Sequence, residues 1–238
     1  MNLPAFGFVS VHQRPLRDGV YNESAWMSGC AAHGRALAHL WQAPRGLVVP
    51  RRYTLLSGWA SACQAGDHGE LQVRASGGGL VPQGPGVWNL SLVWPAPSAQ
   101  PSEIDAVYRS LCDALAAAFA RLGLQATPQP VAGSFCDGRY NLAVGGRKFV
   151  GTAQAWRRVA GVPLVLAHAV VVVSADPAGL TARANAFERA LGTDTVYRSQ
   201  ALTSVAQATD DPFIEARTLS VLAEQFARVV APREHHPE

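Results

Sequence analysis

Gly145-Gly146-Arg147-Lys148-Phe149-Val150-Gly151-Thr152-Ala153-Gln154 is the most informative stretch of the sequence. Its two leading glycines accept the positive φ of a two-residue loop, so residues 140–144 and 147–157 are expected to form a β-hairpin. Lys148 opens the second strand beside apolar neighbours. Such a lysine either extends its ammonium group to water, as on a protected edge strand, or holds it against a bound anion or carbonyl oxygen. Gly151 predicts a close approach by a ligand or another backbone.

The segments that follow extend this pattern toward the C-terminus. Residues 162–174 give the strongest strand signal of the chain, with His168 inside it as either a hydrogen-bonded core histidine or a site residue. Asp176 then caps a predicted helix with Pro177 at its first position. The core of that helix covers residues 180–191, Gly192 closes it, and a last helix is expected from Pro212 to about residue 230.

The segments that precede the hairpin also alternate between strands and helices. Apolar residues at every second position of 88–94 predict a half-buried strand. A helix is expected from Ser102, with Asp105 in a variant capping box, to Gly123. Further upstream we expect a helix over residues 22–42 and short strands at 47–49, 53–56 and 71–74. The interleaving predicts one mixed α/β domain over residues 1–238, with a frayed tail at 232–238.

A glycine run, Arg74-Ala75-Ser76-Gly77-Gly78-Gly79, follows the predicted strand at 71–74. Backbone without Cβ atoms can approach a ligand closely, and Arg74 could add a fixed charge beside it. The run lacks the lysine and hydroxyl residue that end a P-loop, and no dinucleotide-binding glycine pattern opens a helix here. The residues alone leave both a ligand contact and a flexible loop open.

The four cysteines are Cys30, Cys63, Cys112 and Cys136. None forms a CxxC pair or stands at metal-ligand spacing with a histidine, so we expect no metal site. Cys112 falls inside the predicted helix beside its apolar positions and is assigned to packing. Cys136 lies in a loop just before the hairpin, where a thiol near cationic groups can act as a nucleophile, although an inert cysteine is the commoner case.

The composition excludes several classes of protein. With 48% apolar and 16% charged residues among 238, the chain is globular rather than disordered. Its formal charge of +3 comes without a basic stripe, which argues against nucleic-acid binding. The sequence has no recognisable signal peptide, and the apolar run at 161–173 is too short to span a bilayer. We expect a cytoplasmic protein with free thiols and no membrane association.

These segments, in this order, resemble the superfamily of lipoate–protein ligases, octanoyltransferases and biotin–protein ligases over residues 22–176. Its members carry an arginine and S-G-G-G after a strand, similar to residues 74–79, and an N-x-S strand, similar to Trp88-Asn89-Leu90-Ser91-Leu92. They also carry G-[RK]-K-[IF]-x-G-x-A-Q, matched by residues 146–154. A histidine, an apolar run and an aspartate follow, as in His168 through Asp176.

The resemblance implies a largely antiparallel sheet flanked by helices, with an acyl chain in a tunnel beside it. It also implies that Lys148 contacts the acyl carbonyl or an acyl-adenylate, and that the glycine run lines the same pocket. One transferase branch uses a cysteine in F-C-x-G-x-Y-D-L, which Phe135 to Leu142 resembles, so Cys136 is the expected nucleophile. The expected substrate-binding residues are Arg74, Ser76, Gly77, Gly78, Gly79, Gln83, Asn89, Gly151, Thr152, Ala153 and His168.

The expected reaction moves a lipoyl or octanoyl group to a lysine of a lipoyl-domain or acyl-carrier protein, with no tightly bound cofactor. One alternative is a ligase that uses ATP and Mg²⁺, and another is a non-catalytic protein that binds the acyl group or carrier. Gln83 stands where many members have a histidine, and Asn141 where many ligases have an aspartate. The missing carboxylate weakens the ligase alternative. Lipoate is favoured over biotin, and the oligomeric state is left open.

Overall fold

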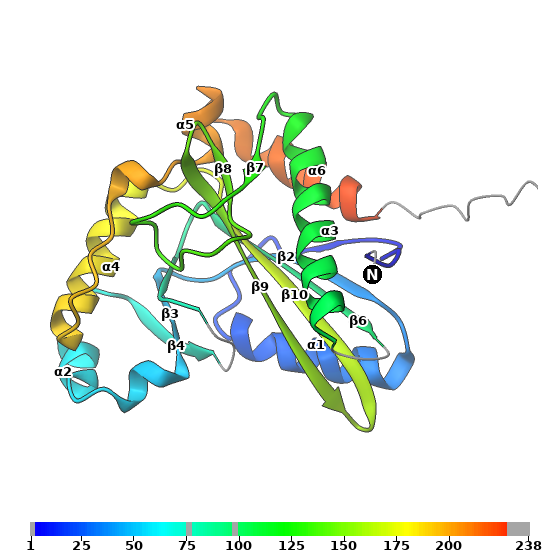
Figure 1. Cartoon of the computed structure of the whole chain (residues 1–238), viewed down its shortest axis with the longest axis horizontal. Coiled ribbons are helices and arrows are strands. Elements are labelled where there is room, and N and C mark those ends of the chain that lie inside the picture. The colour runs from blue at the N-terminus through cyan, green and yellow to red at the C-terminus, as the bar shows by residue number, and fades with distance from the viewer. Residues whose placement is uncertain (1–2, 75–77, 97–99, 228–238) are drawn as a thin grey trace, which may run out of the picture.

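The computed structural model of the chain describes residues 3–74, 78–96 and 100–227. A seven-stranded sheet runs through it in the order β1-β2-β6-β10-β9-β8-β7, and all neighbouring pairs except β1 and β2 are antiparallel (Figure 1). The strands are β1 (Ser10–Val11), β2 (Leu37–Gln42), β6 (Val87–Pro95), β7 (Thr127–Pro128), β8 (Leu142–Val144), β9 (Arg147–Val159) and β10 (Val162–Val172).

A smaller sheet, in the order β4-β3-β5, lies beside the large one. It consists of β3 (Gly46–Pro50), β4 (Glu70–Arg74) and β5 (Val81–Gln83). The helices are α1 (Gly19–His33), η1 (Arg51–Leu55), α2 (Trp59–Gln64), α3 (Pro101–Ala120), α4 (Pro177–Leu191), η2 (Ser199–Ala201), α5 (Val205–Thr209) and α6 (Ile214–Ala227). This arrangement is the expected mixed, largely antiparallel sheet with flanking helices.

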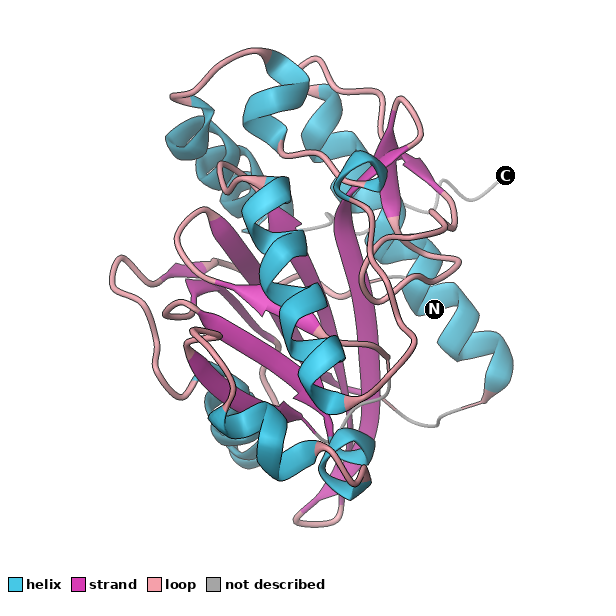
Figure 2. Cartoon of the chain, turned by 90° about the vertical axis from the view of Figure 1, so that its left-hand side faces the viewer, coloured by secondary structure: helices cyan, strands magenta, loops and turns pink. Residues whose placement is uncertain are grey.

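The two faces of the large sheet are covered differently. One face packs against α3 and α6, and their shared core includes Leu92, Leu111, Phe119 and Leu222. The other face lies against α1 and the small sheet, where side chains of β3, β5, β10 and α4 form a second core. Figure 1 shows α2 and α4 together beside β3 and β4, and Figure 2, seen from that side, shows the strands passing behind helices.

Strand pairing brings four residues named from the sequence onto one face. His168 in β10 is paired with Ser91 of β6 and with Ala153 of β9. Two residues further along, Val170 is paired with Asn89 and with Gly151. Side chains alternate between the two faces of a strand. The face covered by α1 and the small sheet therefore carries the side chains of Asn89, Ala153 and His168, and Gly151 occupies a position on the same face.

The hairpin and the helix after it are confirmed. Gly145 and Gly146 join β8 to β9 with φ of 55° and 72°. The side chain of Asp176 accepts hydrogen bonds from the backbone N–H groups of Ala178 and Gly179, and Gly192 ends α4 in the left-handed conformation. No helix in the described ranges is both long enough and apolar enough to cross a membrane.

Two predicted elements near the N-terminus are wrong. The helix expected over residues 22–42 ends at His33, because Gly34 adopts a left-handed φ of 65°. Leu37–Gln42 is instead strand β2, whose apolar residues serve sheet pairing as well as they would serve a helix. Residues 53–56, predicted as a strand, fall largely in the 3₁₀ helix Arg51–Leu55, which leaves the side chain of Leu55 82% exposed.

Two further expectations about β6 and α3 need correction. Strand β6 is buried on both faces from Val87 to Trp94, because α1 and the small sheet cover the face expected to meet solvent. Helix α3 begins at Pro101 rather than Ser102, and the backbone N–H of Gln100 donates to the Glu103 carboxylate at 3.2 Å. Asp105 does not cap this helix and instead binds Arg139 and Tyr140. The expected end of the last helix and the tail at 232–238 lie outside the described residues.

Candidate active site

Lys148, the only lysine of the chain, is held beneath the loop that carries Cys136. Its side chain is 3% exposed, and its ammonium group donates to the carbonyl oxygens of Phe135 at 2.7 Å and Cys136 at 2.9 Å. Burial lowers the pKa of Lys148 from its usual 10.5 to about 8, while nearby Cys136 and Asp137 oppose the shift. A Cβ at Gly151 would lie 3.3 Å from the Nζ of Lys148, so the close neighbour expected at this glycine is the lysine itself.

Cys136 lies in the loop between β7 and β8 with a partly exposed thiol. Its Sγ accepts a hydrogen bond from the backbone N–H of Gly79 at 3.2 Å and lies 3.9 Å from Nη2 of Arg74. Its φ of 51° is in the left-handed region that non-glycine residues rarely adopt. Such strain persists only where surrounding contacts hold the backbone, and the two carbonyl bonds from Lys148 are contacts of that kind.

Two glycines of the glycine run, Gly78 and Gly79, lie against Cys136. A Cβ at Gly79 would lie 3.2 Å from both the N and Cα atoms of Cys136, and one at Gly78 would lie 2.8 Å from its Sγ. Arg74 Nη2 also donates to the carbonyl oxygen of Gly79 at 2.7 Å. These glycines therefore let the main chain approach the cysteine. Ser76 and Gly77, also named from the sequence, lie outside the described residues.

An apolar pocket opens beside the thiol and the ammonium group. Seven of the residues named from the sequence line it: Arg74, Cys136, Lys148, Gly151, Thr152, Ala153 and His168. The sequence reasoning missed the apolar lining residues Val81, Phe135, Phe149, Val170, Val172 and Leu202. Strand periodicity could have identified Val170 and Val172, which share a face with His168. No local pattern indicates Leu202, which directly follows η2.

A second hollow continues the pocket inward and shares Arg74, Val81, His168 and Val170 with it. Gln83 and Asn89, named from the sequence, line this inner part together with Val20, Glu23, Trp41 and Val48. The thiol, the ammonium group and most of the predicted binding residues therefore border these two adjoining hollows, which together are called the cleft. Gly78 and Gly79 support the cysteine from behind and are not among the lining residues.

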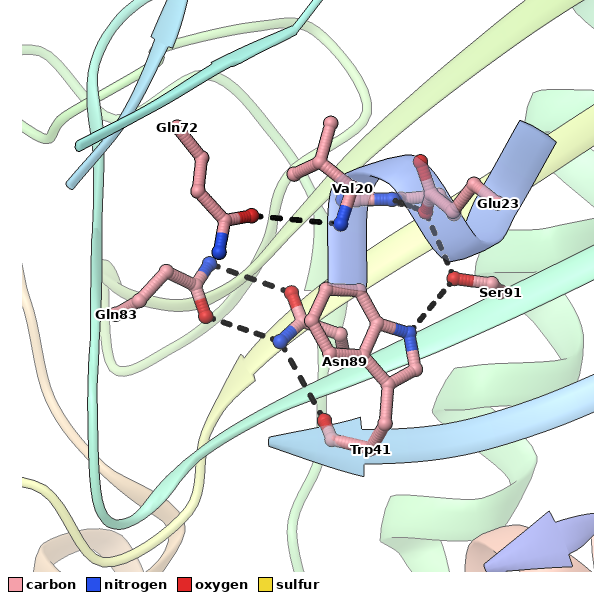
Figure 3. A network of polar contacts seen from close by, with 8 residues as sticks. Val20, Glu23, Trp41, Gln72, Gln83, Asn89 and Ser91 are labelled. Carbon is pink, nitrogen blue, oxygen red and sulfur yellow. Dashed lines mark hydrogen bonds and ion pairs between the residues drawn. The ribbon is translucent and has the colours of Figure 1, made fainter. Parts of the chain in front are cut away.

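Buried side chains at the inner end are joined by hydrogen bonds (Figure 3). The amides of Gln83 and Asn89 exchange two bonds of 3.3 and 2.9 Å. The indole N–H of Trp41 donates to Ser91 Oγ at 3.0 Å, and that hydroxyl donates to Glu23 Oε1 at 2.8 Å. Almost every polar atom of this group has a protein partner, so the inner end is polar but internally satisfied.

His168 connects the two parts of the cleft. Its Nδ1 lies 2.8 Å from Glu23 Oε1, and its side chain is 18% exposed. It therefore makes the hydrogen bond expected of a core histidine. It also borders the pocket, as expected of a site residue. Glu23 was missed from the sequence because a single acidic residue on a helix carries no distinguishing pattern.

The other three cysteines, Cys30, Cys63 and Cys112, are not among the residues that line the cleft. Cys112 is buried within α3, and burial raises the pKa of its thiol to about 12, which fits its assignment to packing. Within the described ranges, no three His, Cys, Asp or Glu side chains gather closely enough to hold a metal ion. Cys136 is therefore the one of the four cysteines that lines this cleft, where it lies beside the Lys148 ammonium group.

Comparison with known proteins gives one consistent family. The model of the lipoyl protein ligase A/B catalytic domain matches residues 30–227. An uncharacterized protein of Cupriavidus necator is 47% identical over 194 residues, covering 75% of this chain and 76% of that protein. An octanoyl-[GcvH]:protein N-octanoyltransferase of Kyrpidia tusciae is 35% identical over 206 residues, covering 82% of this chain and 70% of that enzyme.

Solved structures share the fold at lower identity. The bipartite lipoate protein ligase of Thermoplasma acidophilum, determined in a study that includes its E2 lipoyl domain, is similar with a TM-score of 0.66 and 18% identity. The match covers 94% of this chain and 83% of that one. At this identity, the likeness supports the arrangement of strands and helices described above.

Proposed function

The chain belongs to the family of lipoyl protein ligase A/B catalytic domains, and we propose that it transfers an octanoyl or lipoyl group to a carrier-protein lysine through a thioester on Cys136. The observation that carries this proposal is the placement of the Cys136 thiol and the Lys148 ammonium group on one apolar pocket. A nucleophile and a proton-transfer group that share a pocket fit acyl transfer.

In the first step, the Cys136 thiolate attacks the carbonyl carbon of a donor acyl-lysine amide. A C–S bond forms, the C–N bond breaks, and the departing lysine amine takes up the proton that the thiol released. The name of the Kyrpidia relative supports an octanoylated GcvH protein as the donor. In the second step, a neutral acceptor lysine attacks the thioester, the C–S bond breaks, and the amine proton returns to sulfur.

Lys148 is suited to assist both steps. An ammonium group has three N–H donors, and the carbonyl oxygens of Phe135 and Cys136 occupy two of them. Among the residues that the structure describes, the third has no hydrogen-bond partner, and it can donate to a substrate oxygen on which negative charge develops. A pKa of about 8 also allows Lys148 to give up and regain a proton near neutral pH, as transfer between thiol and amine requires.

The walls of the pocket suit the acyl chain. Val81, Phe149, Val170, Val172 and Leu202 offer an apolar surface next to the two reactive groups. Burial of each methylene group stabilises a bound chain by about 0.8 kcal/mol. An eight-carbon or lipoyl chain therefore binds this pocket by the hydrophobic effect, with its carbonyl group left near Cys136.

We favour the transferase over the ATP-dependent ligase. The Kyrpidia relative, 35% identical over 82% of this chain, carries an octanoyltransferase name, whereas the lipoate–protein ligase structures are 16–18% identical and support the fold alone. The backbone N–H of Gly79, which could meet a phosphate oxygen, already donates to Cys136 Sγ. Lipoyl-carrier proteins are the proposed partners as both donor and acceptor.

Intact-mass analysis after incubation with octanoyl-GcvH tests this proposal. We expect one octanoyl adduct that hydroxylamine removes, because thioesters are labile and the chain's only lysine is buried. Cys136→Ser should lose the adduct and the transfer to an apo lipoyl domain. Cys63→Ser, which changes another partly exposed thiol, should keep both.

Two outcomes would contradict the proposal. One is wild-type transfer by Cys136→Ser, which would remove the thioester from the reaction. The other is modification of the lipoyl domain only when free lipoate and ATP are supplied, which would favour the ligase.

A further inference from the structure

The segment between α4 and α5, residues 193–204, runs beside the loop that carries Cys136. The backbone N–H of Arg198 donates to the carbonyl oxygen of Gly133 at 2.8 Å, and its guanidinium group donates to that of Ala132 at 2.8 Å. A Cβ at Gly133 would collide with this guanidinium group. Arg198 therefore fixes the beginning of the loop through main-chain atoms.

Tyr197 supports the same loop from the inside. Its ring packs edge-on against Phe135 with 6.2 Å between ring centroids, and Phe135 immediately precedes the cysteine. The phenol of Tyr197 donates to the carboxylate of Glu188 at 2.7 Å. Burial raises the pKa of Tyr197, so the phenol keeps the proton that it donates.

Glu188 is a buried anchor that the transfer chemistry does not use. It is 0% exposed and accepts hydrogen bonds from Tyr197, Tyr53 and Thr193 at 2.7, 2.7 and 2.6 Å. The amide of Asn185 binds both the backbone N–H and the carbonyl oxygen of Tyr197, at 2.8 and 2.9 Å. Tyr197 is thus attached to α4 by its side chain and by its main chain.

The segment also reaches the lysine. The backbone N–H of Thr203 donates to the carbonyl oxygen of Lys148 at 2.9 Å, and neighbouring Leu202 lines the pocket. One short segment therefore contacts the chain just before the cysteine and the strand that carries the lysine. The left-handed φ of Cys136 needs contacts of this kind to persist.

We infer that Tyr197 and Arg198 are positioning residues that hold Cys136 against Lys148 and Gly79. The inference rests on the proposed role of Cys136 and adds residues that touch neither the acyl group nor the thiol. Because reacting groups lose rate steeply when displaced, loosening this segment should slow the chemical step more than it weakens donor binding.

The decisive variant is Arg198→Ala, since Arg198 is exposed and its loss leaves the core intact. We expect kcat for octanoyl transfer to fall about tenfold, with KM for octanoyl-GcvH within about twofold of wild type. Arg198→Lys retains a donor for the Ala132 carbonyl oxygen and should recover much of the rate. Arg189→Ala, which removes an exposed arginine from the last turn of α4, is the matched control and should keep wild-type kcat.

A second measurement reports the reactivity of the Cys136 thiol and does not require acyl transfer. The rate of Cys136 alkylation by iodoacetamide is measured against pH, with modification located by peptide mass. In Arg198→Ala the rate should fall by about threefold or more near neutral pH, because the thiol loses part of its contact with the Gly79 N–H group, which favours the reactive thiolate. Tyr197→Phe keeps the ring, loses the bond to Glu188, and should change the profile in the same direction by less.

Intact mass checks that the lysine in Arg198→Lys has not itself been acylated. The inference is overturned if Arg198→Ala keeps the wild-type kcat, or if its alkylation profile is unchanged while kcat falls. It is also overturned if kcat falls only with the folded fraction and Arg198→Lys does not restore it. Failure of the proposed function has a different signature, because wild type would then form no octanoyl-Cys136 while the alkylation profile still tests Arg198.

Discussion

The two ends of the cleft are built from different kinds of atoms. At the outer end, the Cys136 thiol and the Lys148 ammonium group bind almost entirely to main-chain atoms, namely the N–H of Gly79 and the carbonyl oxygens of Phe135 and Cys136. At the inner end, the partners are mainly side chains, as in the bonds that link Trp41, Ser91 and Glu23.

This difference predicts which variants lose catalytic rate and which lose folding stability. Main-chain partners at the outer end cannot be removed by substitution, so changes there act through the reactive groups or through backbone position. Side-chain partners at the inner end are buried, and removal of one leaves another unsatisfied, which costs folding free energy. We therefore expect outer-end variants to lose rate and inner-end variants to lose stability.

The largest effect is expected from Lys148→Met, which keeps the length of the side chain and removes its donors. Loss of one preorganised donor at a developing charge reduces rates by about 10²–10³-fold. We expect a fall of that size in kcat for octanoyl transfer, measured at saturating donor. A variant that retained a tenth of the wild-type rate or more would contradict a main role for the ammonium group in stabilising the developing charge.

A smaller loss is expected from Gly79→Ala, because the added Cβ would lie 3.2 Å from backbone atoms of Cys136. Displacement of the thiol by a few tenths of an ångström should lower kcat by about tenfold. Gly138→Ala is the control in the same loop, since its Cβ would meet no heavy atom within 4 Å. Equal rates for the two variants would contradict a close fit between Gly79 and the cysteine.

At the inner end, Ser91→Ala should leave the chemistry almost unchanged. The substitution removes the acceptor of the buried Trp41 N–H and a donor to Glu23. We expect the free energy of unfolding to fall by about 1–3 kcal/mol, measured by urea denaturation, with kcat within about threefold of wild type. The exposed Ser28→Ala should be nearly neutral by the same measurement. Loss of transfer without loss of stability would contradict the division between the two ends.

The smallest effect is the pH dependence that Lys148 contributes to stability. The folded chain releases this proton near pH 8, whereas the unfolded chain keeps it to about 10.5. The unfolded state therefore binds more protons above pH 8, and stability should rise with pH, by about 1–2 kcal/mol between pH 8 and 9.5. The difference between wild type and Lys148→Met in denaturant titrations isolates this contribution, and parallel curves would contradict it.

Much of the outer end could be predicted from the sequence because its signals are local. The two glycines of the turn, the lysine after them and the cap at Asp176 each act within a few residues. The N-terminal helix was predicted too long because Gly34 and the strand after it look compatible with a helix until β2 pairs with β6.

Local patterns thus determined the hairpin, the position of Lys148 within it and the loop that carries Cys136. Only the tertiary structure decided that Glu23 meets His168, that Gly79 meets the thiol and that Arg198 meets the loop at residues 132–133. These contacts join segments far apart in the chain. They depend on strand register and on the packing of α1 and α4, and neither is encoded in the spacing of nearby residues.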